Sequence, residues 1–237
     1  MSEKKEKALV LCSGGIDSST CLGLAVEKYG KENVVALSIS YGQKHDREIW
    51  SARKVCEYYN VPLYTLDLAK IFTYSKCSLL KGSDKEIPKE SYSEQLTKTD
   101  GMPVSTYVPF RNGLFLSSAA SFALSMDCCT IYYGAHADDA AGSAYPDCST
   151  VFNDAMNKAI YEGSGKQLNV VAPFINSHKA DVVKEGLRLG VPYKYTWSCY
   201  EGKDKPCGHC GTCIDRANAF KLNGVEDPAL TYNFDEE

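Results

Sequence analysis

Residues 8–19 read Ala-Leu-Val-Leu-Cys-Ser-Gly-Gly-Ile-Asp-Ser-Ser, an apolar run followed by a turn rich in glycine and serine. A helical pattern over residues 18–29 follows, so the stretch predicts a buried strand that ends in an anion-binding loop at a helix N-terminus. Gly14 and Gly15 let the backbone approach phosphate oxygens closely, and the helix adds its positive end. No Gly-Lys-Ser/Thr follows, which excludes a Walker A loop. The alternative is a strand-to-helix turn without a ligand.

Short apolar segments alternate with helical patterns along the chain. The expected strands are Ala8–Leu11, Val34–Ser40, Pro62–Asp67, Thr130–Gly134 and Val170–Pro173. The expected helices are Ser18–Tyr29, Arg47–Tyr59, Arg111–Ser125, Thr150–Tyr161, His178–Leu189 and Cys210–Leu222. This order predicts an α/β fold with a doubly wound, mostly parallel sheet and ligands at the carboxyl ends of the strands. Residues 75–106 lack periodicity and predict a mobile insertion, either a lid or an ordinary surface loop.

Length and charge bound the domain organisation and the partners. The 237 residues suffice for an α/β domain with the anion-binding loop at 1–195 and a cysteine-rich segment with a C-terminal helix at 196–237, packed on the same domain. A net charge of −4 argues against direct binding to nucleic acid or to an anionic membrane. The N-terminal apolar run is too short for a signal peptide, so the expected location is cytoplasmic.

Four of the eleven cysteines form a cluster with metal-ligand spacing. Cys199, Cys207, Cys210 and Cys213 lie within fifteen residues, and a Cys-x-x-Cys step places two thiolates on one ion. Four thiolates make a closed shell, so we expect a structural zinc ion rather than a catalytic one. Two alternatives are His209 in place of one cysteine and a redox or sulfur-transfer pair at Cys207 and Cys210.

Further polar clusters follow the expected strands. Arg111 lies at a loop-to-helix junction, where its planar fork suits phosphate or carboxylate. Residues 134–139 follow the fourth strand, residues 145–148 come soon after, and residues 41–45 leave the second strand. Together with the loop, these clusters predict an active site at one edge of the sheet.

The motifs resemble those of a known superfamily and, within it, those of one family. The loop resembles the Ser-Gly-Gly-x-Asp-Ser signature of the pyrophosphate-loop ATPases, whose fold is adenine nucleotide alpha hydrolase-like and Rossmann-like. The chain as a whole resembles the 7-cyano-7-deazaguanine synthase family of queuosine-precursor biosynthesis. The matching motifs are Ser13-Gly14-Gly15-x-Asp17-Ser18, Tyr41-Gly42-Gln43-x-His45, Val108-Pro109-x-Arg111-Asn112-Gly113, Tyr145-Pro146-Asp147-Cys148, Thr196-Trp197-Ser198-Cys199-Tyr200 and the closing cysteines.

The resemblance implies a ligase that uses ATP and ammonia to convert 7-carboxy-7-deazaguanine into 7-cyano-7-deazaguanine. Adenylation turns a carboxylate oxygen, and then an amide oxygen, into a leaving group, so we expect AMP and pyrophosphate as products. The implied cofactors are ATP, structural Zn²⁺ and Mg²⁺. The implied partners are the small-molecule substrates, with free ammonia or ammonia from another protein, and a second copy of the chain in a homodimer.

The resemblance also implies roles for individual residues. The nucleotide-binding set is Cys12, Ser13, Gly14, Gly15, Ile16, Asp17, Ser18, Ser19 and Thr20. Asp17 positions Mg²⁺ or orients the loop, and Arg111 neutralises charge on phosphate or on the substrate carboxylate. Asp147 accepts hydrogen bonds from a guanine-like ring on which Tyr145 stacks. The candidates for deprotonating ammonium or binding metal are His45, Asp138 and Asp139, each of which is otherwise a surface or supporting residue.

Three other functions are compatible with parts of the sequence. Another ligase or an RNA thiolase with a pyrophosphate loop needs an RNA surface or a catalytic cysteine pair, and the acidic balance disfavours it. A zinc-ribbon binding module does not need the phosphate loop. A relative that modifies protein or DNA by the same activation of an acid also fits the sequence.

Overall fold

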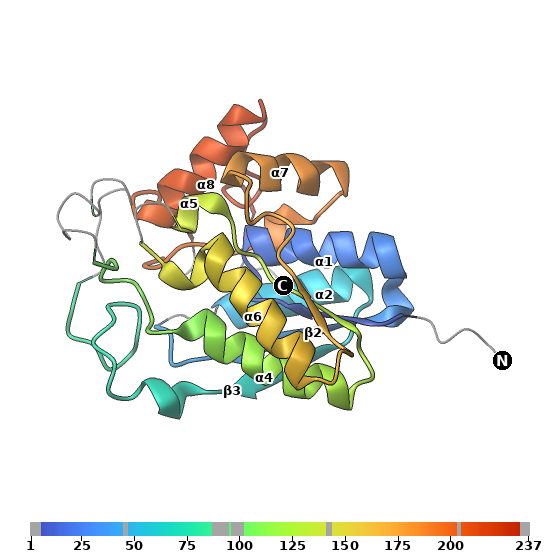
Figure 1. Ribbon diagram of the computed structural model, residues 1–237. Helices are drawn as coiled ribbons and strands as arrows, with labels where there is room; N and C mark the ends of the chain where they lie inside the picture. Colours follow the sequence, from blue (N-terminus) through green and yellow to red (C-terminus); the bar gives the residue numbers. More distant parts are fainter. Residues whose placement is uncertain are drawn as a thin grey trace.

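The computed structural model describes residues 6–44, 47–86, 95, 102–140, 144–202 and 205–232. A parallel sheet runs through the centre of this part of the chain (Figure 1). Its strands are β1 Ala8–Leu11, β2 Val34–Ser40, β3 Leu63–Asp67, β4 Thr130–Tyr132 and β5 Asn169–Val171. They lie in the order β3-β2-β1-β4-β5, and every neighbouring pair is parallel. The predicted doubly wound fold is confirmed.

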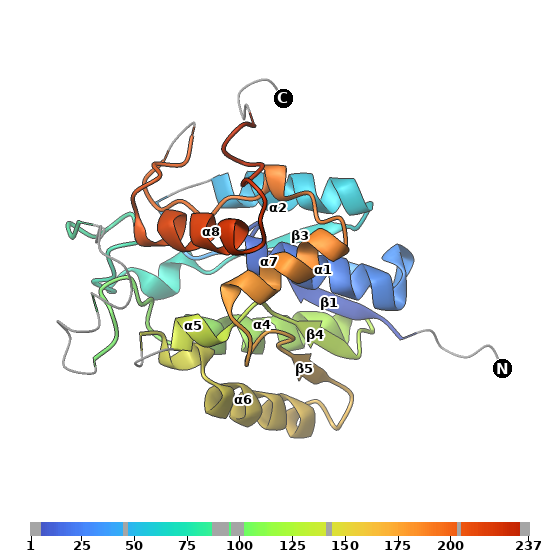
Figure 2. The ribbon, with the colours of Figure 1, turned by 90° about the horizontal axis from the view of Figure 1, so that it is seen from above.

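Helices cover both faces of the sheet (Figure 2). Their bounds are α1 Ile16–Tyr29, α2 Arg47–Tyr59, α4 Arg111–Ser125, α5 Ala137–Ala140, α6 Thr150–Gly163, α7 Lys179–Arg188 and α8 Gly211–Leu222. Short 3-10 turns span Lys31–Asn33, Ala69–Phe72, Pro146–Cys148 and Tyr193–Tyr195. Helices α1, α2, α7 and α8 lie on one face, and α4 and α6 lie on the other. The strand order reverses beside β1, and such a switch point opens a crevice for ligands.

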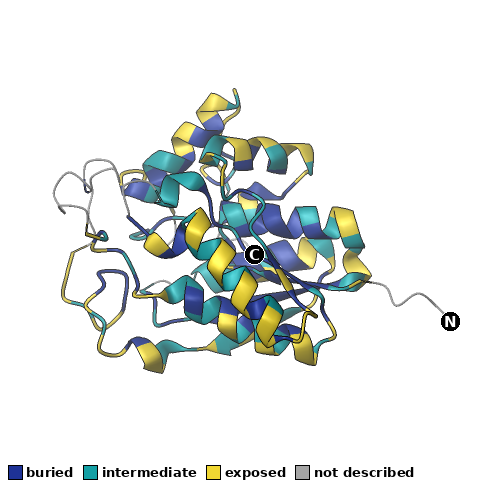
Figure 3. Cartoon of the chain, viewed as in Figure 1, coloured by how far each residue is buried: buried dark blue, intermediate teal, exposed yellow. Residues whose placement is uncertain are grey.

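The central strand β1 shows why the strand segments are continuous apolar runs in the sequence. Successive side chains of a strand point to opposite faces. Ala8 and Val10 therefore belong to the core under α1 and α7, whereas Leu9 belongs to the core under α4. Figure 3 shows the buried residues along the sheet and on the helix faces turned toward it. Because both faces are covered, neither set of side chains needs to be polar.

The C-terminal segment packs on the same body as the sheet. Arg216 of α8 is buried and forms a two-point ion pair with buried Asp227, with Nε–Oδ2 and Nη2–Oδ1 distances of 2.5 and 2.8 Å. Its guanidinium also donates to the carbonyl oxygens of Thr196 and Tyr193, at 3.3 and 3.2 Å. Phe220 joins the core under α1. The polar contacts thus hold the C-terminal segment together, and Phe220 packs it against the core beside the sheet.

Much of the expected insertion at 75–106 lies outside the described residues. At its base, the Ser78 amide donates to the carbonyl oxygen of Ser105 at 3.0 Å. Leu79 and Leu80 pack with Tyr41 in a small apolar cluster of their own. The prediction of a lid thus concerns, in part, residues that the structure does not describe. Among the described residues, no helix has the length and apolar character needed to cross a membrane.

Candidate active site

The phosphate loop joins β1 to α1 at the carboxyl edge of the sheet. The amide of Ser13 donates to the hydroxyl oxygen of Ser18 at 3.2 Å, and the two hydroxyl oxygens lie 3.1 Å apart. The Ser18 hydroxyl also donates to the carbonyl oxygen of Gly15 at 3.3 Å. Gly15 is the N-cap of α1, and among the described residues no side chain caps the start of this helix. The first N–H groups of α1 are therefore available to an anion.

Three residues of the predicted nucleotide-binding set point away from this loop. The side chains of Ile16, Ser19 and Thr20 are fully buried and do not line the cavity described below. The Thr20 hydroxyl lies 2.8 Å from the Ile16 carbonyl oxygen and 2.8 Å from the Tyr193 hydroxyl. The helical period turns these three side chains into the core. At these three positions only backbone groups are left for the predicted contact with a nucleotide, which stays a prediction.

Two glycines allow the loop to lie against its neighbours. Gly14 has a φ of +83°, and a Cβ there would lie 2.4 Å from the amide nitrogen of Ala52 and 2.5 Å from the carbonyl oxygen of Glu48. Gly134 follows β4, and a Cβ there would lie 2.9 Å from the backbone of Asp17 and of Ser18. Only glycine fits where the loop contacts both α2 and the end of β4.

We expect Gly14→Ala to disrupt the phosphate loop. The methyl group meets backbone atoms of α2, and the positive φ adds about 1–2 kcal/mol, so the variant loses roughly 2–4 kcal/mol of stability. ATP binding, measured by calorimetric titration, weakens by at least about tenfold, which corresponds to 1.4 kcal/mol. Gly82→Ala is the matched control, because its Cβ meets nothing within 4 Å. Unchanged ATP affinity and unchanged urea midpoint in Gly14→Ala would contradict the expectation.

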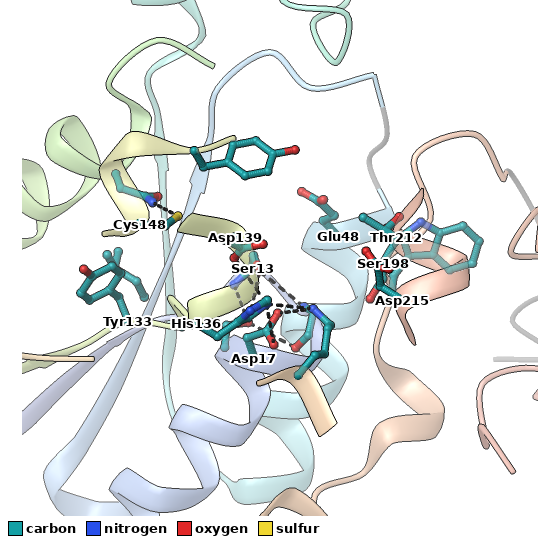
Figure 4. Close-up of a pocket in the computed structure, with 18 of the residues that line it drawn as sticks. Ser13, Asp17, Glu48, Tyr133, His136, Asp139, Cys148, Ser198, Thr212 and Asp215 are labelled. Carbon is teal, nitrogen blue, oxygen red and sulfur yellow. Dashed lines mark hydrogen bonds and ion pairs between the residues drawn. The ribbon is translucent and has the colours of Figure 1, made fainter. Parts of the chain in front are cut away.

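A cavity of about 650 Å³ opens beside the loop, at the carboxyl ends of the strands (Figure 4). Its walls come from the phosphate loop, the ends of β2 and β4, and the first turns of α2, α4, α7 and α8. Of the predicted site residues, those that line it are Cys12, Ser13, Gly15, Asp17, Ser18, Arg111, Asp138, Asp139 and Tyr145. The fold therefore gathers most of the predicted site around one space.

A charged cluster lies where the loop meets α7. The Lys179 ammonium is 2.9 Å from Oδ2 of Asp17 and 3.4 Å from Nε2 of His136. Burial acts to raise the pKa of Asp17, but Lys179 and then His136 outweigh it and hold the pKa below its usual value. Burial acts to lower the pKa of Lys179, but Asp17 and Asp139 raise it above its usual value. Lysine and aspartate are therefore both charged at neutral pH.

Asp138 and Asp139 differ in how far their carboxylate oxygens are engaged by hydrogen bonds. Asp138 accepts from His178 Nδ1 at 2.7 Å and from the Lys179 amide at 2.8 Å, so both of its oxygens orient the start of α7. Asp139 lies 3.4 Å from His136 Nε2 and faces the cavity. Asp215 of α8 lines the same wall, and burial raises the pKa of its carboxyl. The structure thus gives Asp138 a positioning role and leaves Asp139 and Asp215 turned to the cavity.

Arg111 stands on the opposite wall, at the first residue of α4. Its Nη1 donates to the Tyr41 hydroxyl at 3.3 Å, and its guanidinium lies 5.2 Å from the centre of the Tyr41 ring and 6.0 Å from that of Phe115. Burial acts to lower the pKa of Arg111, but its interactions with Tyr41, Cys148 and further acidic groups outweigh burial and raise the pKa above its usual value. A guanidinium held between aromatic rings is positioned to receive a carboxylate.

Asp147, predicted to accept hydrogen bonds from a guanine-like ring, contacts the start of α4, and its role stays a prediction. Asp147 is 4% exposed and does not line the cavity. Its Oδ2 accepts from the Asn112 amide at 2.8 Å, and Asn112 Nδ2 donates to its carbonyl oxygen at 3.1 Å. The carboxylate thus satisfies an amide in the first turn of α4 instead of facing a ring. Tyr145 does line the cavity, and its hydroxyl lies 2.6 Å from that of Thr106.

The four cysteines come together as predicted. Their sulfur atoms all lie within 4.8 Å of one another, and the Cys199–Cys210 and Cys207–Cys213 pairs are 4.0 Å apart. A tetrahedral site with Zn–S bonds of 2.3 Å has sulfur atoms about 3.8 Å apart. Cys199 Sγ also accepts from the amides of Gly202 and Cys207, at 3.0 and 3.2 Å, which favours the thiolate. The cluster fits a four-coordinate metal ion.

His209 and His45 complete the predicted set. His209 is exposed, with Nε2 at 2.9 Å from Glu201 Oε2 and Nδ1 at 2.8 Å from the Cys207 carbonyl oxygen. Glu201, Cys207 and His209 form a second group with metal-ligand geometry, which shares one cysteine with the first. His45 lies outside the described residues, so its role stays a prediction.

Sequence reasoning missed three charged residues of the cavity wall: Lys179, Glu48 and Asp215. Each lies in the first turns of a helix that points at the carboxyl edge of the sheet. Lys179 could have been found from its position after the last strand, because Asp138 and Asp139 were predicted from the same kind of position. Glu48 and Asp215 do not directly follow a strand, so their approach to the cavity depends on helix packing.

Hydrogen bonds of Trp197 connect the cysteine segment to the phosphate loop. The Trp197 amide donates to the Gly14 carbonyl oxygen at 2.9 Å, and the buried indole donates to the Cys199 carbonyl oxygen at 2.8 Å. One residue therefore connects the backbone of the loop with a cysteine of the cluster.

The sequence profile described as "Queuosine biosynthesis protein QueC" matches residues 7–224. The chain belongs to this family. It is 44% identical to the 7-cyano-7-deazaguanine synthase of Archaeoglobus fulgidus, over 98% of this chain and 91% of the relative. It is 40% identical to that of Caldicellulosiruptor bescii, over 94% of this chain and 96% of the relative. Both the phosphate loop and the four cysteines lie inside the QueC match.

One solved structure shows how widely the fold is shared. NMN synthetase from Francisella tularensis superposes with a TM-score of 0.50 at 18% identity, covering 94% of this chain and 79% of that chain. At this level of identity the likeness concerns the fold alone. The QueC family assignment therefore rests on the sequence matches, and the chemistry rests on the residues of the site.

Proposed function

We propose that this QueC family member is an ATP-dependent ligase that converts 7-carboxy-7-deazaguanine and ammonia into 7-cyano-7-deazaguanine. The observation that carries the proposal is a single cavity that joins an open phosphate loop to Arg111 and Tyr145. The loop and Lys179 suit polyphosphate, the guanidinium suits a carboxylate, and the tyrosine ring suits a flat heterocycle. Relatives at 40–44% identity bear the name of this activity.

The reaction follows from the need for two leaving groups. The substrate carboxylate attacks the α-phosphorus of ATP, and pyrophosphate leaves. Ammonia attacks the acyl adenylate, and AMP leaves to give the amide. The amide oxygen then attacks the α-phosphorus of a second ATP, and pyrophosphate leaves. Loss of AMP and of both protons of the amide nitrogen gives the nitrile. The loop amides and Lys179 stabilise the negative charge that builds on the departing pyrophosphate.

Zn²⁺ and Mg²⁺ have distinct places in this proposal. Cys199, Cys207, Cys210 and Cys213 hold a structural zinc ion, which closes the 196–213 segment. Mg²⁺ supplies charge neutralisation on the ATP phosphates and usually takes only one or two carboxylates from a protein. Asp139 and Asp215 are the cavity carboxylates suited to that role, whereas Asp17 is paired with Lys179. The proposed acting unit is a cytoplasmic homodimer without bound nucleic acid.

The test is a product assay by mass spectrometry. With 7-carboxy-7-deazaguanine, ammonium, Mg²⁺ and ATP, we expect the nitrile together with AMP and pyrophosphate. The mixture without ammonium is the control and yields no nitrile. Formation of ADP and phosphate alone would overturn attack at the α-phosphorus. Consumption of ATP with other acids but not with this one would leave the scaffold in place and overturn the substrate.

A further inference from the structure

Glu48 is a cavity carboxylate to which no step has yet been assigned. It lies in the first turn of α2 and lines the cavity (Figure 4). Its backbone carbonyl oxygen is one of the atoms that exclude a Cβ at Gly14. Glu48 is thus anchored directly beside the phosphate loop, where the acid must be activated.

The contacts of Glu48 hold it in place without neutralising it. The Tyr41 amide donates to Gln43 Oε1 at 2.9 Å, which turns the amide nitrogen of Gln43 toward Glu48. That nitrogen is 3.5 Å from Oε2 of Glu48, the outer limit of a hydrogen bond. Within the described parts of the chain, no lysine, arginine or histidine forms an ion pair with this carboxylate.

The other carboxylates of the cavity already have a charged partner, a hydrogen-bond donor or a proposed metal ion. Asp17 is paired with Lys179, and Asp138 accepts from His178 and from a backbone amide. Asp139 lies 3.4 Å from His136 Nε2, and Asp139 and Asp215 are the carboxylates proposed above for Mg²⁺. Glu48 is therefore the wall carboxylate with room for a small cationic ligand.

The surroundings of Glu48 also suit proton exchange near neutral pH. Burial raises its pKa to about 7, against the opposing effects of the Arg111 guanidinium and the Gln43 amide. The Tyr41 hydroxyl also faces it, and burial followed by the Glu48 charge raises the pKa of that phenol, so it stays protonated. A carboxylate that titrates close to the working pH is an effective general base.

We propose that Glu48 binds ammonium and takes a proton from the nitrogen as it attacks the acyl adenylate. This inference rests on the proposed function. The carboxylate removes one proton from ammonium to give ammonia and the neutral acid. The nitrogen lone pair forms the C–N bond, the C–O bond to AMP breaks with its electron pair, and water accepts the surplus proton. No oxidant or further reactant is needed.

The deciding experiment separates acid activation from attack by nitrogen. Exchange of labelled pyrophosphate into ATP needs the acid but not ammonium, and amide plus nitrile formation needs both. We expect Glu48→Gln to retain the exchange rate of the wild type and to lose about 100- to 10,000-fold in ammonium-dependent turnover. Glu48→Asp keeps the carboxylate and regains part of the turnover.

Two further readouts distinguish a base from a merely structural group. At saturating ammonium, turnover of the wild type rises with pH through about 7 as Glu48 ionises, and Glu48→Gln lacks this inflection. Hydroxylamine, which is neutral at that pH, restores acyl transfer in Glu48→Gln as the hydroxamate. The variant also melts no lower than the wild type at pH 8, because ionisation of a carboxyl with a raised pKa destabilises the folded state.

Two results for Glu48→Gln overturn the role of Glu48. One is a fall in the exchange of labelled pyrophosphate into ATP that is as large as the fall in amide formation. The other is an ammonium-dependent turnover equal to that of the wild type. Absence of exchange with 7-carboxy-7-deazaguanine in the wild type overturns the proposed function itself, and this inference with it. The exchange assay therefore tells the two failures apart.

Discussion

Lys179→Met lowers kcat/KM for ATP by about 100- to 1,000-fold, or roughly 3–4 kcal/mol of transition-state stabilisation. The ammonium is the cation at the N-terminus of α7 that faces the loop, 2.9 Å from Asp17 and 3.4 Å from His136. Negative charge moves onto pyrophosphate as the acid is adenylated, and a fixed cation beside the loop stabilises that charge. Steady-state kinetics at saturating acid and ammonium measure the effect.

We also expect Lys179→Met to lower the stability of the fold. Without Lys179, the Asp17 carboxylate loses its main charge partner, and its pKa rises toward the value set by burial. Both side chains are about one-fifth exposed, so we expect a loss of about 1–2 kcal/mol, less than for a fully buried pair. The loss disappears as pH falls and Asp17 becomes protonated, since a carboxyl with a lowered pKa stabilises the fold only while ionised.

Lys184→Met is the matched control for this prediction. Lys184 is exposed on the same helix and does not line the cavity. Its replacement leaves kcat/KM within about twofold and changes stability by less than about 0.5 kcal/mol, as is usual at the surface. Equal activity of the two lysine variants would show that Lys179 only supports Asp17.

Loss of the metal site has the second large effect. Cys210→Ser removes a buried ligand from the four-cysteine cluster, so bound zinc, measured by plasma mass spectrometry, falls from roughly one equivalent to near zero. The free energy of metal binding is also free energy of folding. Loss of about 4 kcal/mol lowers the melting temperature by roughly 10 °C in a chain of this size.

The structure also predicts a consequence for ATP. Trp197 connects the cysteine segment to the phosphate loop through its amide, 2.9 Å from the Gly14 carbonyl oxygen. Disorder of the segment therefore weakens ATP binding as well as stability. Cys129→Ser is the control, because Cys129 lies outside the cluster and is only partly buried. A Cys210→Ser protein that melts and binds ATP like the control would refute a structural role for the metal.

Local sequence patterns were enough to predict the strands, the longer helices and their order along the chain. Ala8–Leu11 and the glycine turn after it predicted a strand, a loop and a helix, and the spacing of apolar segments predicted the remaining strands of the sheet. These features depend on local preference and on burial, which one segment records by itself. The four cysteines were equally clear, because ligand spacing in sequence reflects the reach of the chain around one ion.

Tertiary structure decided which polar residues share the cavity. The motif at 145–148 contains both Tyr145 and Asp147, yet packing against α4 turns the carboxylate inward to Asn112 and leaves the ring at the cavity. Glu48 and Lys179 are 131 positions apart, and they line one space because parallel strands bring the starts of α2 and α7 to the same edge of the sheet. Side-chain direction and charge pairing depend on neighbours distant in sequence, so no local pattern specifies them.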